Sequence, residues 1–313
     1  MKIIRDLEHF VEHKPVVLTQ GTFDGVHLGH QKIITHVVKK AREIDGVSVL
    51  LTFYPHPRLV LFPDDNQLKM LSTIDEKAQL LESFGLDYLV ILPFTKEISR
   101  ISAYQFIKDI LVEKLHISTI IVGYDHRFGK NREGSIVEIK KFSHQFNYQI
   151  DQIAEQDIND CIVSSTKIRN ALLDGNIPHA NELLGRTFGI RGIVIEGNKL
   201  GKTLGFPTAN VEISDTYKLI PMNGVYAVRV NVLAKTYNGM ANIGTRPTLN
   251  LKTRSIEVHI FNFNDNIYGQ ELEILFVKRW RNEIKFETVK LLQHQLKADA
   301  AEITTFFEHF ESK

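Results

Sequence analysis

The stretch GTFDGVHLGH, residues 21–30, joins a predicted strand to a predicted helix. The apolar run 15–19 before it is typical of a buried strand, and residues 31–41 after it carry apolar side chains at helical spacing. A glycine-rich turn at a helix N-terminus gathers free backbone N–H groups at the positive end of the helix dipole, where a phosphate binds favourably. The stretch therefore predicts an α/β protein with a phosphate site at this turn.

The histidines and glycines of this turn favour a ligand site over a purely structural strand–helix turn with incidental histidines. His27 and His30 lie three residues apart, and imidazoles there can form hydrogen bonds with a phosphate whose charge changes during a reaction. Gly21, Gly25 and Gly29 leave the backbone room for a close approach by a ligand.

The bulk composition indicates a globular protein of two domains. The length of 313 residues suffices for two cores, and 43% hydrophobic and 24% charged residues are ordinary values. A net charge of +1 does not indicate a nucleic-acid partner, and the single cysteine, Cys161, excludes an internal disulfide. Because the N-terminus is unlike a signal peptide and no apolar run approaches the roughly 18 residues of a membrane span, we expect a cytoplasmic protein.

Strand-like and helix-like runs alternate in the first half of the chain. The strand-like runs lie near 15–20, 47–53, 87–92, 118–123 and 147–153. The helix-like runs lie near 30–45, 75–84, 102–115 and 135–144. This alternation predicts a parallel sheet with helices on its faces and a ligand site at the carboxyl ends of the strands.

The pattern changes near residue 185, where short β runs with turn signals begin. These runs lie near 190–196, 224–233, 235–243, 255–263 and 271–279. They predict a small closed antiparallel barrel, and the periodic segment 286–311 predicts a long terminal helix. We therefore expect one domain over residues 1–185 and a second over residues 186–313.

Three more segments of the first half suit a ligand. TFYPHP, residues 52–57, is a proline-stiffened loop, and GYDHRFG, residues 123–129, offers a carboxylate, cations and glycines after a strand. SSTKIR, residues 164–169, begins like a capped helix, and Arg169 one turn in could reach a phosphate. A rigid turn, a solvated loop and a simple helix cap are the respective alternatives.

With residues 21–30, these segments resemble the FMN adenylyltransferase module of the prokaryotic bifunctional riboflavin kinase/FAD synthetase family, and His27-x-Gly29-His30 resembles the HxGH signature of nucleotidylyltransferases. The resemblance implies a Rossmann-like nucleotidylyltransferase domain in which His27, His30 and Arg169 are catalytic. The ATP or phosphate contacts that it implies are Gly21, Phe23, Asp24, Gly25, Gly29, Ser165 and Thr166. The flavin contacts that it implies are Pro55, His56, Asp125, Arg127 and Phe128.

Two segments of the second half also carry chemistry. In GKTLGFPTAN, residues 201–210, Thr208 and Asn210 alternate in an extended run, so a hydroxyl and an amide oxygen face the same way and can hold a hard cation such as Mg²⁺. A hairpin turn is the alternative. In SIEVHIF, residues 255–261, Glu257 could accept a proton from a substrate hydroxyl or be only a solvent-facing residue of a barrel strand.

These segments, with NIGTRPT at 242–248 and Tyr268-Gly269, resemble the riboflavin kinase module of the same family. The resemblance implies that Glu257 is the catalytic base and that Thr208 and Asn210 hold Mg²⁺ with ATP. The phosphate-loop residues that it implies are Gly201, Lys202 and Gly205, and the flavin contacts are Arg281 and Phe286.

The resemblance implies flavin cofactor synthesis in two steps. ATP phosphorylates riboflavin to FMN, and a second ATP adenylylates FMN to FAD with release of pyrophosphate. Riboflavin, FMN and ATP are the expected partners, Mg²⁺ is the expected cofactor, and the oligomeric state stays open. An enzyme with one inactive module and a non-catalytic flavin-binding regulator are the alternatives.

Overall fold

The computed structural model describes residues 1–64, 68–123, 128–129, 134–153, 163–197, 200–248 and 251–311. Of the residues in its helices and strands, it does not describe the side chains of Leu200, Lys202, Glu311 and residues 246–248 and 251–253. The chain packs into two compact units, Met1–Ser165 and Thr166–Lys313, which are described separately below.

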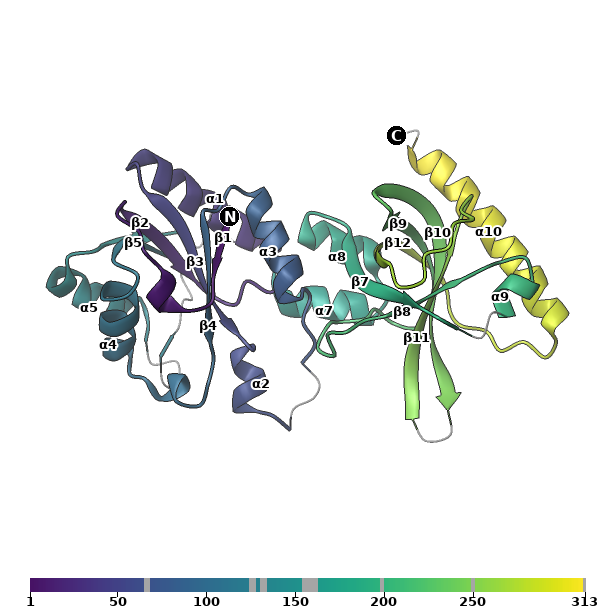
Figure 1. Ribbon diagram of the computed structural model, residues 1–313, viewed down its shortest axis with the longest axis horizontal. Coiled ribbons are helices and arrows are strands. Elements are labelled where there is room, and N and C mark those ends of the chain that lie inside the picture. Colours follow the sequence, from purple (N-terminus) through teal and green to yellow (C-terminus); the bar gives the residue numbers. More distant parts are fainter. Residues whose placement is uncertain are drawn as a thin grey trace. The chain divides into compact units, whose positions relative to one another are not determined.

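The first unit contains a parallel sheet of six strands (Figure 1), as predicted. Its strands are β1 (Lys2–Ile4), β2 (Val16–Gln20), β3 (Val47–Tyr54), β4 (Tyr88–Pro93), β5 (Ile117–Val122) and β6 (Gln149–Gln152). Their order in the sheet is β1-β4-β3-β2-β5-β6, so the direction in which strands are added reverses at β2. Ligands of such sheets bind outside the carboxyl ends of the strands at this reversal.

Helices cover both faces of this sheet, which gives three layers. Helices α1 (Leu28–Glu43) and α3 (Ile74–Ser83) pack on one face, where Ile34 and Leu81 join Val17 in a core. Helix α4 (Ala103–Gln105), the π-helical segment η3 (Phe106–Val112) and helix α5 (Ile136–Phe146) cover the other face. Among the described residues, the unit also has three short helical segments: η1 (Leu7–His9), α2 (Pro57–Leu61) and η2 (Ile98–Arg100).

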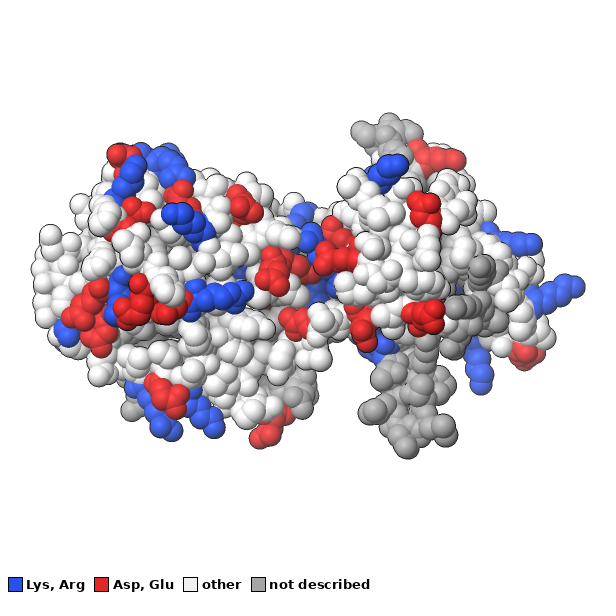
Figure 2. Space-filling model, in the orientation of Figure 1, with Lys and Arg blue, Asp and Glu red and all other residues white. Residues whose placement is uncertain are grey.

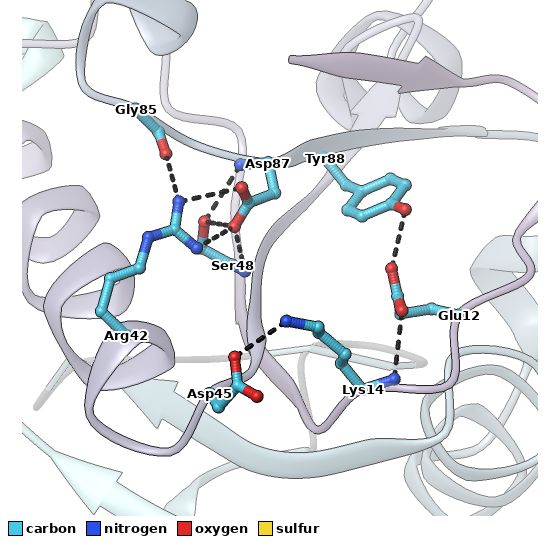
Figure 3. A network of polar contacts seen from close by, with 8 residues as sticks. All are labelled: Glu12, Lys14, Arg42, Asp45, Ser48, Gly85, Asp87 and Tyr88. Atoms are coloured by element: carbon cyan, nitrogen blue, oxygen red, sulfur yellow. Dashed lines mark hydrogen bonds and ion pairs between the residues drawn. The ribbon is translucent and has the colours of Figure 1, made fainter.

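A polar network fixes the amino ends of the strands (Figure 3). Asp87, just before β4, accepts hydrogen bonds from Arg42 of α1 at 2.8 and 2.9 Å and from the Ser48 hydroxyl at 2.7 Å. Although burial opposes the shift, the hydrogen bonds from Arg42 and Ser48 lower the pKa of Asp87. Beside it, Lys14 pairs with Asp45 at 2.8 Å. This network lies at the edge of the sheet opposite the predicted ligand site.

The second unit contains a closed barrel of six strands, as predicted. Its strands are β7 (Phe188–Ile195), β8 (Ala209–Glu212), β9 (Gly224–Val232), β10 (Lys235–Thr248), β11 (Leu251–Ile260) and β12 (Glu271–Arg281). All neighbouring strands pair antiparallel in the order β10-β11-β8-β7-β12-β9. Alternation along β11 buries Ile256, Val258 and Ile260 and places Glu257 and His259 on the outer face.

Four helices accompany the barrel in the part of the unit that the structure describes: α7 (Ser165–Leu173), α8 (Ile177–Leu184), α9 (Leu200–Thr203) and α10 (Val289–Glu311). Helix α10 begins three residues later than the predicted segment 286–311 and packs on the outside of β9 and β10 through Ile303 and Phe307. Helix α8 is tied to the barrel because Asn181 donates to the Phe276 carbonyl at 2.9 Å. The contacts therefore divide the chain into two packed units after Ser165. The predicted boundary between residues 185 and 186 concerns the limits of the two functional modules, and it stays a prediction.

The surface carries charges of both signs. On the face drawn in Figure 2, blue and red side chains are interspersed over each unit, in line with the net charge of +1. Among the described residues, no helix has the length and apolar character needed to span a bilayer.

Candidate active sites

The loop between β2 and α1 has an unusual backbone. Phe23, Gly25 and Val26 have φ angles of 45°, 80° and 40°. This region is rare for residues with side chains, and each such residue costs about 1–3 kcal/mol unless its surroundings hold it in place. Strain of this kind, at the carboxyl end of the central strand, is typical of a ligand-binding loop.

Asp24 holds this loop in place. Its carboxylate, 2% exposed, accepts hydrogen bonds from the backbone N–H groups of Leu71 at 3.0 Å and Ser72 at 3.2 Å. The Ser72 hydroxyl accepts in turn from Gly25 N–H at 3.1 Å, and the Ser165 hydroxyl donates to the Asp24 carbonyl at 3.0 Å. The structure thus gives Asp24 an anchoring role, while its predicted phosphate contact stays a prediction.

The two histidines of the motif lie against each other at the start of α1. His27 caps the helix, because its Nδ1 accepts from the His30 N–H at 3.4 Å, and a neutral His27 therefore carries its proton on Nε2. The rings stack at a centroid distance of 3.6 Å, and Phe23 lies 4.7 Å from the His30 ring. Phe23, His27 and His30 thus form one cluster at the N-terminus of α1.

Burial and neighbouring charge keep His30 neutral. Burial, then the charges of His27 and Lys77, hold the pKa of His30 well below its ordinary value of 6.5. Its Nδ1 is buried and has no hydrogen-bond partner among the residues that the structure describes. A buried polar atom of this kind calls for a partner, and a phosphate oxygen at the helix N-terminus would provide one.

We expect Gly25→Ala to destabilise the first unit by more than a φ penalty alone. A Cβ at Gly25 would lie 2.7 Å from Leu71 Cδ1, whereas one at Gly85, with a similar φ of +76°, would lie 4.0 Å from its nearest neighbour. Gly85→Ala should cost about 1–2 kcal/mol, and Gly25→Ala about 1–3 kcal/mol more.

Urea unfolding followed by circular dichroism measures this difference. Trp280, the single tryptophan, belongs to the other unit, so its fluorescence midpoint should stay unchanged in both variants. Equal midpoints for Gly25→Ala and Gly85→Ala would show that Leu71 does not restrict the loop.

The structure describes three of the five predicted flavin contacts of the first unit, Pro55, His56 and Phe128. His56 caps α2 by accepting from Arg58 N–H at 3.1 Å, and Pro55 before it is exposed. Phe128 is 5% exposed and packs on Phe106 at a centroid distance of 5.6 Å, as part of the core. Asp125 and Arg127 lie outside the described residues, and Thr166 and Arg169 lie on α7 in the second unit; their roles stay predictions.

The second unit has a cleft of about 340 Å³ between the outer face of the barrel and α10. It brings together five residues predicted from the sequence: Gly201, Thr208, Glu257, Arg281 and Phe286. Leu292, Leu296 and Asp299 of α10 form its other wall. The outer face of β11 is therefore covered rather than open to bulk solvent, which is why Glu257 faces a cleft.

Glu257 lies between two asparagines. In the barrel register it pairs with Asn210 of β8 on one side and with Asn242 of β10 on the other. Asn210 is 9% exposed. Two residues along β11, His259 Nδ1 lies 2.8 Å from the Pro207 carbonyl, and burial lowers the pKa of His259, so the neutral ring donates there. Glu257 thus has a polar residue opposite it on each flanking strand.

Glycine is required where segment 201–206 folds beside Thr208. A Cβ at Gly201 would lie 2.3 Å from the Phe206 carbonyl oxygen and 3.2 Å from Thr208 Oγ1. Gly205 has a φ of +85°, which favours glycine. The backbone of this loop can therefore approach the Thr208 hydroxyl closely. The side chain of Lys202 is outside the described part of the chain.

Arg281 makes a buried ion pair that the sequence did not predict. Its Nε donates to Asp299 Oδ1 at 2.9 Å and its Nη2 to Oδ2 at 2.5 Å, and Asp299 is 1% exposed. Arg281 lines the cleft as predicted, but its guanidinium also fastens β12 to α10. Asn242 and Asp299 were missed as site residues; only Asn242 had a sequence signal, since it lies in the segment 242–248.

Comparison with known proteins assigns both units to a family. The model described as FAD synthetase matches residues 9–167, and the model described as riboflavin kinase matches residues 184–307. Curated proteins named bifunctional riboflavin kinase/FMN adenylyltransferase from Buchnera aphidicola and Listeria monocytogenes are 39% and 38% identical, covering 98% and 94% of this chain and 99% and 93% of theirs.

The Escherichia coli protein of the same name is 35% identical over 98% of both chains. A crystal structure described as a macrolide-efflux protein from Streptococcus pneumoniae has a TM-score of 0.85 at 30% identity and covers 96% of this chain and 97% of its own. With both modules matched over nearly the whole length, this chain belongs to the family of bifunctional riboflavin kinase/FMN adenylyltransferases.

Proposed function

We propose that riboflavin is phosphorylated in the cleft beside Glu257 and that FMN is adenylylated at the turn that carries His27 and His30. The arrangement of Glu257 between Asn210 and Asn242, in a cleft that Thr208 also lines, carries the first assignment. The stacked histidines at the N-terminus of α1 support the second.

In the kinase step, Glu257 accepts the proton of the riboflavin 5′-hydroxyl as that oxygen attacks the γ-phosphorus of ATP. A new P–O bond forms, the bond to the β-phosphate oxygen breaks, and ADP leaves. A carboxylate fixed within reach of the hydroxyl contributes about 10²–10⁴ to the rate by general-base catalysis. The flanking Asn210 and Asn242 keep the Glu257 side chain aimed into the cleft.

Thr208 and Asn210 fit a magnesium ion bound with ATP. Their hydroxyl and amide oxygens are hard donors, and Mg²⁺ takes few protein ligands because it keeps water and phosphate oxygens. A Cβ at Gly201 would clash with the Phe206 carbonyl oxygen at 2.3 Å, so glycine lets the loop backbone pack close to the Thr208 hydroxyl. When bound, the ion offsets the negative charge that develops on the phosphates.

In the adenylyl step, an FMN phosphate oxygen attacks the α-phosphorus of the second ATP, and pyrophosphate leaves. No covalent enzyme intermediate is needed, so the protein contributes position and charge stabilisation. His27 and His30 donate hydrogen bonds to the phosphate oxygens, and the N-terminus of α1 supplies positive potential. The contributions of Ser165, Thr166 and Arg169 and the cytoplasmic location stay predictions from the sequence.

Thr208→Val tests the magnesium assignment. Removal of one oxygen ligand should raise the Mg²⁺ concentration for half-maximal FMN formation about tenfold, the equivalent of about 1.4 kcal/mol. Thr236→Val is the matched control, since Thr236 belongs to the same barrel and its hydroxyl donates to Asn231 at 2.7 Å, outside the cleft. A Mg²⁺ dependence of Thr208→Val equal to that of Thr236→Val would refute the assignment.

A further inference from the structure

A buried lysine contacts the histidine turn from the neighbouring helix. Lys77 of α3 is 7% exposed, and its Nζ donates to the Thr22 carbonyl at 2.6 Å. Thr22 is its only hydrogen-bond partner among the described residues. Because burial of an ammonium is costly unless other charges compensate, this position points to a role beyond packing.

Lys77 belongs to the segment 71–77, which contacts the 21–30 turn at three residues: Thr22, Asp24 and Gly25. Leu71 and Ser72 bind the Asp24 carboxylate through their N–H groups, the Ser72 hydroxyl accepts from Gly25, and Lys77 holds the Thr22 carbonyl. The contacts at Asp24 and Gly25 fix the part of the turn with positive φ. Lys77 fixes its beginning, directly after the central strand, and is the member of the set that brings a positive charge.

The charge of Lys77 acts on His30. Asp24 on the turn and His30 on α1 are the titratable groups whose charges interact with it. Burial lowers the pKa of Lys77 to about 8, against the opposing effect of Asp24, and the charge of Lys77 contributes to the low pKa of His30. A polyphosphate at the N-terminus of α1 would favour the charged form of Lys77.

We propose that Lys77 is a positioning residue of the adenylyltransferase site. Its ammonium fixes the Thr22 carbonyl, and with it the start of the 21–30 turn, and it adds positive potential behind the place where the ATP phosphates bind. This proposal rests on the proposed function of His27 and His30. Lys77 would thus hold the turn in shape and also increase the affinity of the turn for polyphosphate.

Three variants of the full chain test this role, with FMN and Mg-ATP supplied. Lys77→Met removes the donor and the charge at similar volume, and should lower kcat/KM for ATP in FAD formation about 100-fold, the effect typical of one lost preorganised charge contact. Lys77→Arg keeps the charge and should recover at least a tenth of the wild-type value. Lys14→Met removes an exposed lysine that pairs with Asp45, and should match the wild type.

The pH dependence separates positioning by charge from a purely structural role. As pH rises through about 8, wild-type Lys77 loses its proton, so kcat/KM for ATP should fall; this fall should be absent in Lys77→Arg, which stays charged. A wild-type kcat/KM in Lys77→Met would overturn the proposal, and so would the same fall with pH in Lys77→Arg.

Riboflavin phosphorylation by the same variants provides an internal control, because it takes place in the other unit. It should be unchanged in Lys77→Met, which shows that the second unit is folded, and urea unfolding followed by circular dichroism, as for Gly25→Ala, reports on the first unit. If His30→Ala retained wild-type FAD formation while Lys77→Met lost it, the proposed function of the histidines would fail and the role of Lys77 would stand. The two proposals can therefore fail separately.

Discussion

Glu257→Gln is expected to lower kcat for riboflavin phosphorylation by about 10²–10⁴, the contribution of a general base. Glutamine keeps the size of the side chain and its place between Asn210 and Asn242, but it cannot take the proton of the ribityl hydroxyl. Because the change leaves the cleft intact, KM for riboflavin should change much less than kcat. Initial rates of FMN formation, separated by chromatography, measure both.

The controls for Glu257→Gln are a second glutamate and the second activity. Glu271 is exposed on β12 and does not line the cleft, so Glu271→Gln should retain wild-type kinase activity. FAD formation from supplied FMN should be unchanged in both variants. A kcat for Glu257→Gln within threefold of the wild type would rule out Glu257 as the base.

His30→Ala is expected to lower kcat for FAD formation from supplied FMN by about 10²–10³, as for the loss of one donor that stabilises developing charge. The imidazole stacks on His27 and packs on Phe23, and its Nδ1 is buried at the helix N-terminus. Its removal takes a hydrogen-bonding group from the phosphate site, while FMN formation in the barrel should be unchanged. Pyrophosphate release, measured with FMN and Mg-ATP, follows the reaction directly.

His36→Ala is the matched control for His30→Ala. His36 lies on the same helix, farther from its N-terminus, and pairs with Asp151 at 2.8 Å. Its loss should leave kcat for FAD formation within about twofold of the wild type, because this partly exposed side chain lies away from the helix N-terminus and contacts Asp151 rather than the phosphate site. If His36→Ala lost as much activity as His30→Ala, a general weakening of α1 would explain both results.

The sequence predicted much of the fold because local patterns determine it. Alternating strand and helix runs placed β2 to β6 and the longer helices between them, but not the short α2 and η2, and β runs with turn signals placed most of the barrel. The three-residue β1 is too short to give a strand signal of its own, and β8 was predicted only as an extended run at Thr208 and Asn210. The start of α10 was placed three residues early because Phe286 continues its apolar spacing, although it belongs to the lining of the cleft.

The sequence could predict only those parts of the sites whose residues lie close together in the chain. His27 and His30 lie in one turn, and alternation put Glu257 on the outer face of its strand. That α10 covers this face, that Arg281 pairs with Asp299, and that Lys77 holds Thr22 depend on contacts between residues 18 or more positions apart. No local pattern encodes such contacts. Phe128 packs in the core, and its predicted flavin contact stays a prediction.

The central claim is that one chain carries two separate sites, one with Glu257 and one with His30. Mixing the Glu257→Gln and His30→Ala proteins tests it most directly, with riboflavin and Mg-ATP as the only substrates. We predict that neither variant alone forms FAD at an appreciable rate, and that the mixture does, because FMN made by His30→Ala is adenylylated by Glu257→Gln. Accumulation of FMN without FAD in the mixture, or FAD formation by either variant alone at the wild-type rate, would contradict it.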